Sequence, residues 1–336
     1  MLKATVIIVI GLILLCLIAS SAVYLQPVKA QYQGNITINA DGTISPSSAP
    51  IQQSGIIYTL TSDENGTLVV ERNDTVVNGQ GYTLFGELSL SDVSNVTVKD
   101  FRIIGSGGLQ TQQIGISLTE TSNVVIANNT ISGEGSIMAI NAEGLYTGIY
   151  VDDGSSNILK GNNLESNIDA IYLYNTEHNL IVGNNLTDMS NPWDSYSSAL
   201  VFDHASNNTV YHNNFINFEG EQVSDLNSVN TWDGGYPIGG NYWSDYQTRY
   251  PNATEIEGSG IGNIPYVIDA NNTDYYPLLG QVDISKPVPT STLLYAVSSP
   301  TPAVPELSWL AIIPLFLSVL SIAIILRHLK TANLKF

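Results

Sequence analysis

Apolar and polar residues alternate over short stretches of this chain, and Gly and Asn interrupt the pattern every few residues. Alternation with period two is typical of half-buried β-strands, because successive side chains of a strand point to opposite faces. Strong helix formers are sparse outside two terminal apolar segments. The pattern therefore predicts an all-β body of short strands joined by turns.

Two short motifs repeat along this body. The first is a polar residue and an Asn ahead of a β-prone stretch, and its copies begin at Ser94, Ser122, Ser156, His178 and Asn207. The second begins five positions after that Asn and reads Asn-Asn in most copies, at 128–129, 162–163, 184–185 and 213–214. Each unit is thus predicted to hold a short strand, a two-residue Asn corner, a second short strand and a variable loop.

Stacked repeats of this kind predict a parallel β-solenoid, in which each coil pairs with the next and inward side chains form apolar columns. Asn suits the corners because it tolerates left-handed backbone angles, and equivalent Asn side chains in register can form an amide ladder. We therefore assign a structural role to one such ladder, formed by Asn128, Asn162, Asn184 and Asn213.

Alignment of four longer strands separates an inner from an outer face. The side chains predicted to face the core are Ile149, Val151, Ile171, Leu173, Leu200 and Phe202. Two outer rows cross the coils, one of Ser117, Tyr150, Tyr172 and Val201, the next of Thr119, Asp152, Tyr174 and Asp203. The residues that follow at the strand ends are Glu120, Asp153, Asn175 and His204.

This outer face is the candidate ligand surface. Tyr rings can stack on the C–H faces of sugars, and carboxylates accept hydrogen bonds from sugar hydroxyls. A purely structural tyrosine ladder is the alternative, because cross-strand aromatic pairs stabilise sheets by themselves. The predicted ligand-binding residues are Tyr150, Asp152, Tyr172, Tyr174, Asp203 and His204.

Both ends of the chain are apolar. Residues 4–25 precede a small residue suited to signal-peptidase cleavage after Ala30, so 1–30 is predicted to be a signal peptide, with an uncleaved anchor as the alternative. Residues 307–326 form an uncharged stretch of bilayer-spanning length, and the basic residues of 327–336 place that tail in the cytoplasm. We therefore expect a single-pass protein of the cell membrane, with its body extracellular or in the pseudoperiplasm.

Charge narrows the classes of partner. The chain has 30 acidic and 11 basic residues, and 29 acidic but only 6 basic residues fall within 31–305. A nucleic-acid binder needs a basic surface, so nucleic acid is excluded as a partner, and the body is expected to attract cations and repel polyanions. The single cysteine, Cys16, lies in the N-terminal apolar segment, which excludes a disulfide framework.

The body also carries nine Asn-x-Ser/Thr sequons. N-glycosylation is expected at these sites in a host that performs it, which would make this a cell-surface glycoprotein. The sequon residues are Asn35, Asn65, Asn73, Asn95, Asn128, Asn185, Asn207, Asn252 and Asn271.

Four further motifs accompany the repeats. They are Asn-Gly-Gln-Gly-Tyr at 78–82, Trp-Asp-Gly-Gly-Tyr-Pro at 232–237, Gly-Gly-Asn-Tyr-Trp-Ser-Asp-Tyr at 239–246 and Gly-Ile-Gly-Asn-Ile-Pro-Tyr-Val-Ile-Asp at 260–269. Together with the repeats they resemble the NosD-like right-handed parallel β-helix proteins of the pectin-lyase-like superfamily, in particular archaeal surface proteins with a C-terminal anchor. The resemblance covers about residues 60–280 and implies a right-handed parallel β-helix more strongly than any activity.

This family resemblance also bears on metals. Relatives usually carry an Asp-rich run typical of a calcium loop, but residues 257–263 keep fewer carboxylates here, so calcium is left open. The family is named after a periplasmic protein linked to copper delivery, and soft copper sites gather Met, Cys or His. Copper is disfavoured and no cofactor is predicted, because the body offers few such residues, namely His178, His204, His212, Met138 and Met189.

Catalysis is the main alternative to binding, because polysaccharide hydrolases and lyases share this solenoid. Asp152 and Asp203 lie two coils apart, which separates their backbones by about 10 Å, near the spacing of an inverting carboxylate pair. The motifs of polygalacturonases and the basic array of pectate lyases do not occur, so we expect no catalysis. The carboxylates to test are Asp152, Asp153 and Asp203.

These observations divide the chain into seven parts. They are a signal peptide (1–30), an N-terminal cap region (31–60), β-helix repeats (61–232), an aromatic C-terminal cap (233–280), a Pro/Ser/Thr-rich stalk (281–306), a transmembrane helix (307–326) and a cytoplasmic tail (327–336). The expected role is a membrane-anchored surface protein that binds polysaccharide or builds the cell envelope. A copper accessory role is a further alternative.

Overall fold

The computed structural model describes residues 32–105, 113–133, 146–187, 198–216 and 221–286. The chain divides into two compact units, Met1–Ser299 and Pro300–Phe336, and all described residues belong to the first. The predicted signal peptide, transmembrane helix and cytoplasmic tail lie outside the described residues, as does the stalk beyond Lys286. Within the described ranges, no helix is both long and apolar enough to cross a membrane.

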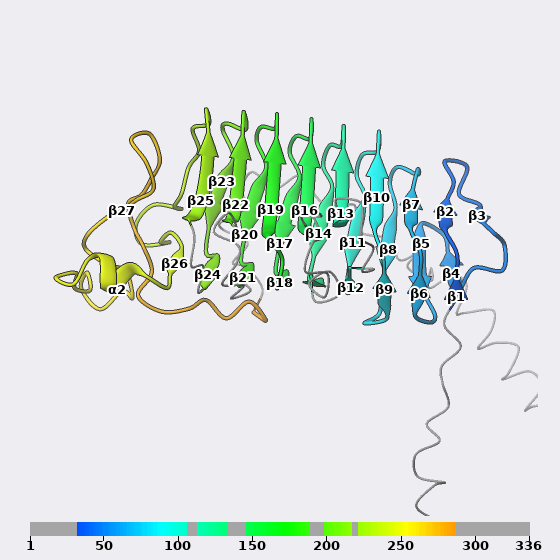
Figure 1. The fold of residues 1–336 in the computed structure, drawn as a ribbon, viewed down its shortest axis with the longest axis horizontal. Helices are drawn as coiled ribbons and strands as arrows, with labels where there is room; N and C mark the ends of the chain where they lie inside the picture. Colours follow the sequence, from blue (N-terminus) through cyan, green and yellow to red (C-terminus); the bar gives the residue numbers. More distant parts are fainter. Residues whose placement is uncertain (1–31, 106–112, 134–145, 188–197, 217–220, 287–336) are drawn as a thin grey trace, which may run out of the picture. The chain divides into compact units, whose positions relative to one another are not determined.

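Three sheets are built from short strands in a repeating order, so that each coil visits sheet A, then B, then C (Figure 1). Sheet A holds β1 (Tyr32–Gln33), β6 (Glu64–Asn65), β9 (Thr83–Phe85), β12 (Arg102–Ile104), β15 (Thr130–Ser132), β18 (Asn163–Glu165), β21 (Asn185–Thr187), β24 (Asn214–Ile216) and β26 (Tyr242–Trp243). Sheet B holds β2 (Ile36–Ile38), β3 (Ile44–Ser45), β7 (Leu68–Val70), β10 (Leu88–Ser91), β13 (Gln113–Thr119), β16 (Tyr146–Asp152), β19 (Asp169–Tyr174), β22 (Ser198–Asp203) and β25 (Glu221–Leu226). Sheet C holds β4 (Ile51–Ser54), β5 (Ile57–Leu60), β8 (Val76–Asn78), β11 (Thr97–Lys99), β14 (Val125–Ala127), β17 (Ile158–Lys160), β20 (Leu180–Val182) and β23 (Thr209–Tyr211).

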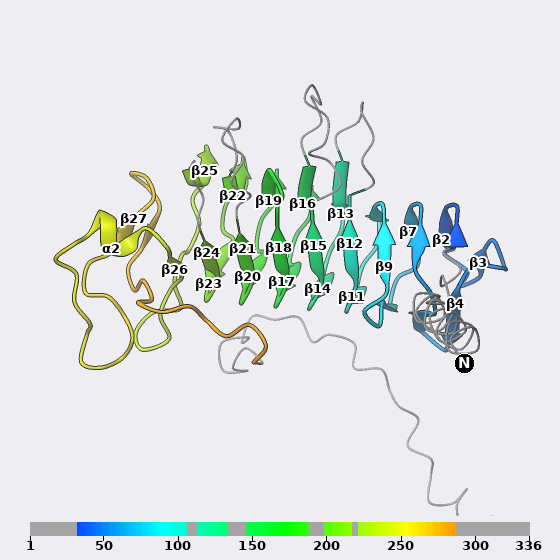
Figure 2. The same cartoon turned by 60° about the horizontal axis from the view of Figure 1, so that its bottom comes forward.

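The coils form the predicted parallel β-helix. Each strand of a sheet pairs in parallel with its equivalent in the next coil, as in β16 with β19 and β19 with β22. Figure 2 shows the strands of sheets A and C running side by side along the stack. The residues predicted to form the core from sheet B are buried, with Ile149, Ile171 and Leu200 fully enclosed. The alternation in the sequence therefore reports the inner and outer faces directly.

The solenoid begins earlier than the sequence indicates. Residues 31–60, assigned to a cap region, already contribute strands to all three sheets, and β2 pairs in parallel with β7. The departures from a regular coil are two antiparallel pairs, β2 with β3 and β4 with β5. The β3 and β4 strands thus add a short closing layer at this end of the described body.

An Asn ladder lines the corner between sheets C and A. Asn162, Asn184 and Asn213 lie in it, fully buried, and each donates from Nδ2 to the Oδ1 of the next Asn along the stack. The preceding member is Asn129 and not Asn128, as Asn129 Nδ2 donates to Asn162 Oδ1 at 3.1 Å. Asn128 instead takes the exposed left-handed position at φ 56°, because Thr130 pairs with Asn163 and so sets the register one residue later.

A second ladder lies at the corner between sheets B and C. Its members are Asn157, Asn179, Asn208 and Asn230, and the Nδ2–Oδ1 distances are 3.0 Å from Asn179 to Asn208 and 3.1 Å from Asn208 to Asn230. Before Asn157, Asn179 and Asn208 the preceding residue adopts a left-handed conformation, for example His178 at φ 58°. The corner therefore needs two residues, one that tolerates positive φ and one that turns an amide inward.

The C-terminal cap continues the core as a column of aromatic rings. Phe215 stacks on Trp243 at 4.2 Å between ring centroids, and Trp243 stacks on Tyr266 at 4.1 Å. The guanidinium of Arg249, in the short helix α2 (Tyr246–Arg249), lies 4.7 Å from the Tyr266 centroid and closes the column. Trp232 and Tyr246 are buried in the same cluster, whereas Trp193, the other tryptophan of the predicted cap, lies outside the described residues.

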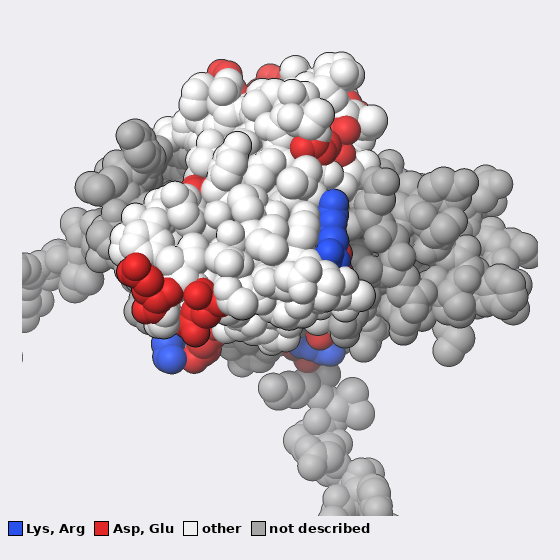
Figure 3. All heavy atoms as spheres, turned by 90° about the vertical axis from the view of Figure 1, so that its left-hand side faces the viewer, with Lys and Arg blue, Asp and Glu red and all other residues white. Residues whose placement is uncertain are grey.

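A small hairpin of β27 (Tyr266–Val267) and β28 (Thr273–Asp274) ends both ladders. Asn272 Oδ1 accepts from the backbone N–H of Asn230, and Asp274 Oδ2 accepts from that of Asn241 at 2.7 Å. Gly240 permits this approach, because a Cβ there would meet a carboxylate oxygen of Asp274 at 1.9 Å. Figure 3 looks onto this end of the stack, where most surface side chains are uncharged.

Candidate ligand-binding surface

Two rows of side chains on the outer face of sheet B form a ribbon along the stack, and we name these eight residues the outer ribbon. Strand register sets the first row as Ser117, Tyr150, Tyr172 and Val201. It sets the second row as Thr119, Asp152, Tyr174 and Asp203. Both rows have the order predicted from the sequence, because the strands keep their alternation in every coil.

The two half-buried tyrosines of the outer ribbon contact each other. The ring centroids of Tyr150 and Tyr172 lie 5.6 Å apart with the planes tilted by 48°. Burial is the largest cause that raises the pKa of Tyr150, and it raises the pKa of Tyr172 to about 12 together with the nearby carboxylate of Asp203. Both phenols are therefore neutral at physiological pH and present ring faces and hydroxyl groups to a ligand.

Asp203 contacts Tyr172, in the first row of the outer ribbon, and His204, in the row of residues that follow the strand ends (the strand-end row). The hydroxyl of Tyr172 donates to Asp203 Oδ2 at 3.2 Å, and His204 Nδ1 lies 2.7 Å from Asp203 Oδ1. The latter contact requires a proton on Nδ1, which fixes the ring orientation of His204 and leaves Nε2 for another partner. The exposed His204 side chain thus has a defined orientation.

Asp152 has a different environment from Asp203. Its Oδ1 atom is buried and has no hydrogen-bond partner among the described residues. Burial, and next the charge of neighbouring Asp153, raise the pKa of Asp152. The outer ribbon therefore contains two carboxylates of unlike character, one poorly solvated and the other engaged by two donors.

The strand-end row turns the chain from sheet B toward sheet C. Glu120, Asp153, Asn175 and His204 all have positive φ, between 51° and 54°, which places equivalent side chains above one another in consecutive coils. Asn175 Nδ2 donates a short hydrogen bond to Asp153 Oδ1. At the N-terminal end of this row, the negative charge of Asp92 raises the pKa of Glu120. The first two side chains of this row are thus carboxylates, and the next two are an amide and an imidazole.

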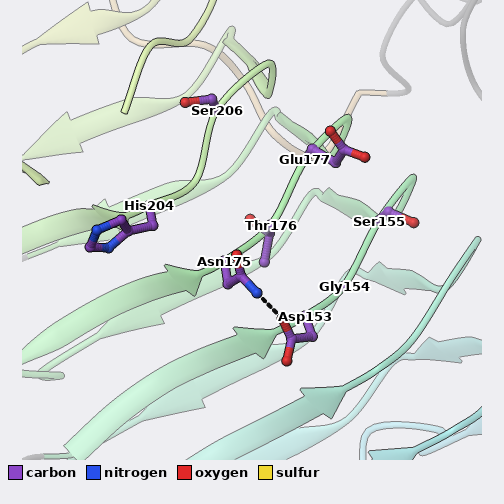
Figure 4. Close-up of a pocket in the computed structure, with 8 residues that line it drawn as sticks. All are labelled: Asp153, Gly154, Ser155, Asn175, Thr176, Glu177, His204 and Ser206. Atoms are coloured by element: carbon purple, nitrogen blue, oxygen red, sulfur yellow. Dashed lines mark hydrogen bonds between the residues drawn. The ribbon is translucent and has the colours of Figure 1, made fainter. Parts of the chain in front are cut away.

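A pocket of about 360 Å³ opens beside these turns (Figure 4). Asp153, Asn175 and His204 enter its lining from three consecutive coils. The other lining residues were not predicted from the sequence, although they occupy the same turns one or two positions after the predicted ones. These residues are Gly154, Ser155, Thr176, Glu177 and Ser206. Asp153, Asn175 and His204 of the pocket directly follow Asp152, Tyr174 and Asp203 of the outer ribbon, so the pocket adjoins the ribbon at the strand ends.

The histidines of the body do not converge. His212 Nε2 lies 2.7 Å from the backbone oxygen of Ile238, and His178 Nδ1 lies 3.7 Å from Glu177. Across the described residues, no three side chains of the types His, Cys, Asp and Glu come together as a metal site. The described residues also include no Met or Cys, because Met138, Met189 and Cys16 fall outside them.

Comparison with known proteins matches this chain to one family over most of its length. The family described as periplasmic copper-binding protein (NosD) matches residues 19–248. The chain belongs to the NosD family. No curated protein matches it.

Solved structures similar to this NosD-family chain include two mutants of the periplasmic alginate epimerase AlgG. The first has 10% sequence identity and a TM-score of 0.33, and the alignment covers 63% of this chain and 68% of that one. The second has 11% identity and a TM-score of 0.20, with 63% and 71% covered.

The described part of this NosD-family member does not fit copper. A copper site needs several soft or imidazole ligands at one point. His204 is engaged by Asp203, His212 contacts a backbone carbonyl oxygen, and no thioether or thiol is present among the described residues. The family description therefore does not identify a copper centre on the described surface of this chain.

Proposed function

We propose that this chain is an exported, non-catalytic surface protein whose outer ribbon and adjoining pocket bind carbohydrate. The observation that carries the proposal is the pair of neutral tyrosine rings, Tyr150 and Tyr172, set between acceptors on the same face. Ring faces suit the C–H faces of sugars, and the carboxylates of Asp152 and Asp203 suit sugar hydroxyls.

Spacing along the stack supports a linear ligand. Equivalent residues of adjacent coils lie about 4.8 Å apart, so the four coils of the outer ribbon span about 14 Å. That length accommodates two to three sugar units in an extended chain. The exposed Tyr174, at 40%, lies between Asp152 and Asp203 in the second row and adds a more accessible ring.

The test is retention of the full chain, solubilised in detergent, on immobilised neutral polysaccharides. Tyr150→Ala and Tyr172→Ala should each weaken binding about tenfold, the effect of losing one stacking contact of about 1.4 kcal/mol. Tyr275→Ala is the matched control, because Tyr275 is 61% exposed on the cap and far along the sequence from the outer ribbon. Equal retention of all three variants would refute the assignment.

Glycoside hydrolysis is the second candidate, and the unlike environments of Asp152 and Asp203 favour it. A poorly solvated carboxyl group suits a general acid, and a hydrogen-bonded carboxylate suits a general base. Release of reducing ends from a bound polysaccharide, abolished by Asp152→Asn and by Asp203→Asn, would replace the non-catalytic proposal with this one. Asp153→Asn tests the third candidate carboxylate.

The proposed location is the cell surface, with the body outside the membrane. The family description is periplasmic, and no sequon Asn is buried in the described body. Protease added to intact cells should therefore degrade the body, and enzymatic deglycosylation should lower its mass when it is made in a glycosylating host. Protection from protease in intact cells would contradict this location.

A further inference from the structure

The outer face of sheet C carries an apolar stripe. In β14 and β17, the inward side chains are Ile126 and Leu159, so Val125, Ala127 and Ile158 point outward. These three residues form a hydrophobic cluster separate from the main core. The corresponding faces of sheets A and B carry mainly Asn, Thr, Ser and Tyr instead, so the stripe is specific to sheet C.

The stripe is covered. Val125, Ala127 and Ile158 are only 4%, 5% and 5% exposed, although they lie on the outside of a single sheet. Among the described residues, the only hydrophobic side chain packed against them is Leu180, which comes from the same sheet. A side chain on the outer face of one sheet becomes this buried only when another segment lies over it.

The last described residues return toward this region from the cap. Val282 N–H donates to Asn214 Oδ1 at 2.7 Å, and Asn214 Nδ2 donates to the Val282 oxygen at 2.8 Å. Asn214 begins β24, in the coil whose sheet C strand is β23. Figures 1 and 2 show the orange segment that follows the cap running back along the stack in the direction of earlier coils. The chain beyond Lys286 therefore starts beside the stack and not beyond its end.

The residues that follow have the composition of a covering strand. Residues 293–297 read Leu-Leu-Tyr-Ala-Val, an uncharged stretch between Pro, Ser and Thr. They begin seven positions after Lys286, a length that an extended chain spans over about 23 Å. The stripe lies two to three coils from β23, about 10–14 Å. The segment can therefore reach Val125 and Ile158 with length to spare.

We propose that residues 288–297 dock on the outer face of sheet C as an extended strap over Val125, Ala127 and Ile158. The strap shields the stripe from solvent, and the stripe fixes the direction in which the stalk leaves the body. The strap lies on sheet C and the proposed ligand surface on sheet B, so the two occupy different faces of the stack.

Proximity can be tested by cross-linking of the full chain in a Cys16→Ser background. Ile158→Cys combined with Leu294→Cys should give an intramolecular product with a short bismaleimide. Thr187→Cys combined with Leu294→Cys is the control, because Thr187 lies on the outer face of sheet A. The proposal is overturned if both pairs react equally, if neither reacts, or if the Ile158 pair yields only cross-linked dimers, which would identify a second copy as the cover.

Shielding can be tested by hydrogen exchange of the same full chain. Leu293→Asp with Leu294→Asp should speed exchange of amides in β14 and β17 at least tenfold, because charged residues do not pack on an apolar stripe. Ser298→Asp with Ser299→Asp adds equal charge just beyond the strap and should leave those amides unchanged. Equal exchange in the two double variants would overturn the strap, and the unfolding temperature of the core shows that each variant remains folded.

Discussion

An inward-turned Asn such as Asn184 joins three consecutive coils. Its Oδ1 accepts from the backbone N–H and the Nδ2 of Asn162, and its own Nδ2 donates to Asn213 Oδ1 and to the backbone oxygen of Leu159. Every donor and acceptor involved is buried, so the amide group replaces water at a corner where the strand ladders are interrupted. The residue is therefore structural and cannot be exchanged for an apolar one without leaving polar groups unpaired.

A pair of neighbouring substitutions tests this role. Asn162→Ala should lower the free energy of unfolding by about 3–5 kcal/mol, because it leaves several buried hydrogen-bonding groups without a partner. Asn163→Ala should cost less than about 1 kcal/mol, because that side chain points outward and, among the described residues, its hydrogen bonding is limited to a long 3.5 Å contact with Glu165. Urea titration of both variants gives the comparison, and similar midpoints would argue against the ladder as a stabilising element.

Glu64 is the least satisfied charged residue of the described body. It is fully buried in β6, neither carboxylate oxygen has a described partner, and burial raises its pKa to about 7. The folded state therefore favours the protonated acid more than the unfolded chain does. The contribution of protonated Glu64 to the stability of the fold is therefore complete below pH 4.5, its ordinary pKa. That contribution is lost as the pH rises through about 7, its pKa in the folded state.

Glu64→Gln should remove this pH dependence. Above pH 8 the variant should be more stable than the parent by up to about 3 kcal/mol, and near pH 4 the two should agree. Burial also raises the pKa of Asp274 and Asp225, so the parent and the variant must be compared at each pH. Glu71→Gln, at an exposed position, serves as control, and a pH-independent difference between Glu64→Gln and the parent would count against the mechanism.

The one-residue error at Asn128 shows where residue-level prediction fails. Asn128 and Asn129 are both plausible ladder members by type, and Asn123 precedes Val124 where later coils place a ladder Asn. Only the register of Thr130 with Asn163 decides between them. The glycines at the same corner could have revealed the correct register. Gly161 and Gly183 occupy the left-handed position just before the ladder Asn in the following coils, and Asn128 occupies the same position in its own coil.

Strands and turns differ in how far the sequence predicts them. The outer ribbon was predictable, because period-two alternation in β16, β19 and β22 fixes both the face and the row of each residue. The pocket was not, because its lining combines turn residues whose side-chain directions depend on backbone angles at Asp153, Asn175 and His204. Alternation carries information about strands, whereas turn geometry is set by contacts between coils.

The hairpin of the cap works as the last element of the stack. Asp274 accepts from the backbone of Asn241 and from Trp243 Nε1 at 2.9 Å, in the place where a following coil would supply an Asn. A carboxylate suits this place because only acceptors are needed there. The aromatic column and the ladder thus end at the same two-stranded element.

Asp274→Ala should uncouple this element from the stack. Two buried N–H groups lose their acceptor, so amides of β26 and of the 266–274 hairpin should exchange at least tenfold faster, while those of β13 stay protected. Native-state hydrogen exchange measures both regions in one sample. Glu257→Gln, at an exposed cap position, is the control, and unchanged protection in Asp274→Ala would show that the aromatic column alone holds the cap.

Charge acts at the scale of the whole molecule. The chain has a formal net charge of −19, and the outer ribbon and its strand ends supply carboxylates but no lysine or arginine. Lys99 and Lys160 lie on sheet C instead. A polyanionic glycan approaching sheet B therefore meets repulsion that a neutral glycan does not.

The resulting prediction concerns the ligand class. At low ionic strength a neutral polysaccharide should be retained and a polyuronate should not, and added salt should narrow the difference by screening. Asp152→Asn combined with Asp153→Asn should likewise improve polyuronate retention. Tight binding of the polyuronate by the parent protein at low salt would be incompatible with this view of the surface.

The direction of the Asn ladders has a consequence for biosynthesis. Each Asn side chain accepts from the N–H of the coil before it and donates to that coil's carbonyl oxygen, as Asn213 does toward Asn184 and Ile181. The buried backbone groups at the corner of one coil therefore gain their hydrogen-bond partners only from the next coil in the sequence. Since the ribosome delivers the N-terminal coils first, the growing protein holds one unfinished edge at a time, and that edge disappears only when the final hairpin emerges. The order of synthesis and the order of hydrogen-bond closure are the same, which favours vectorial folding.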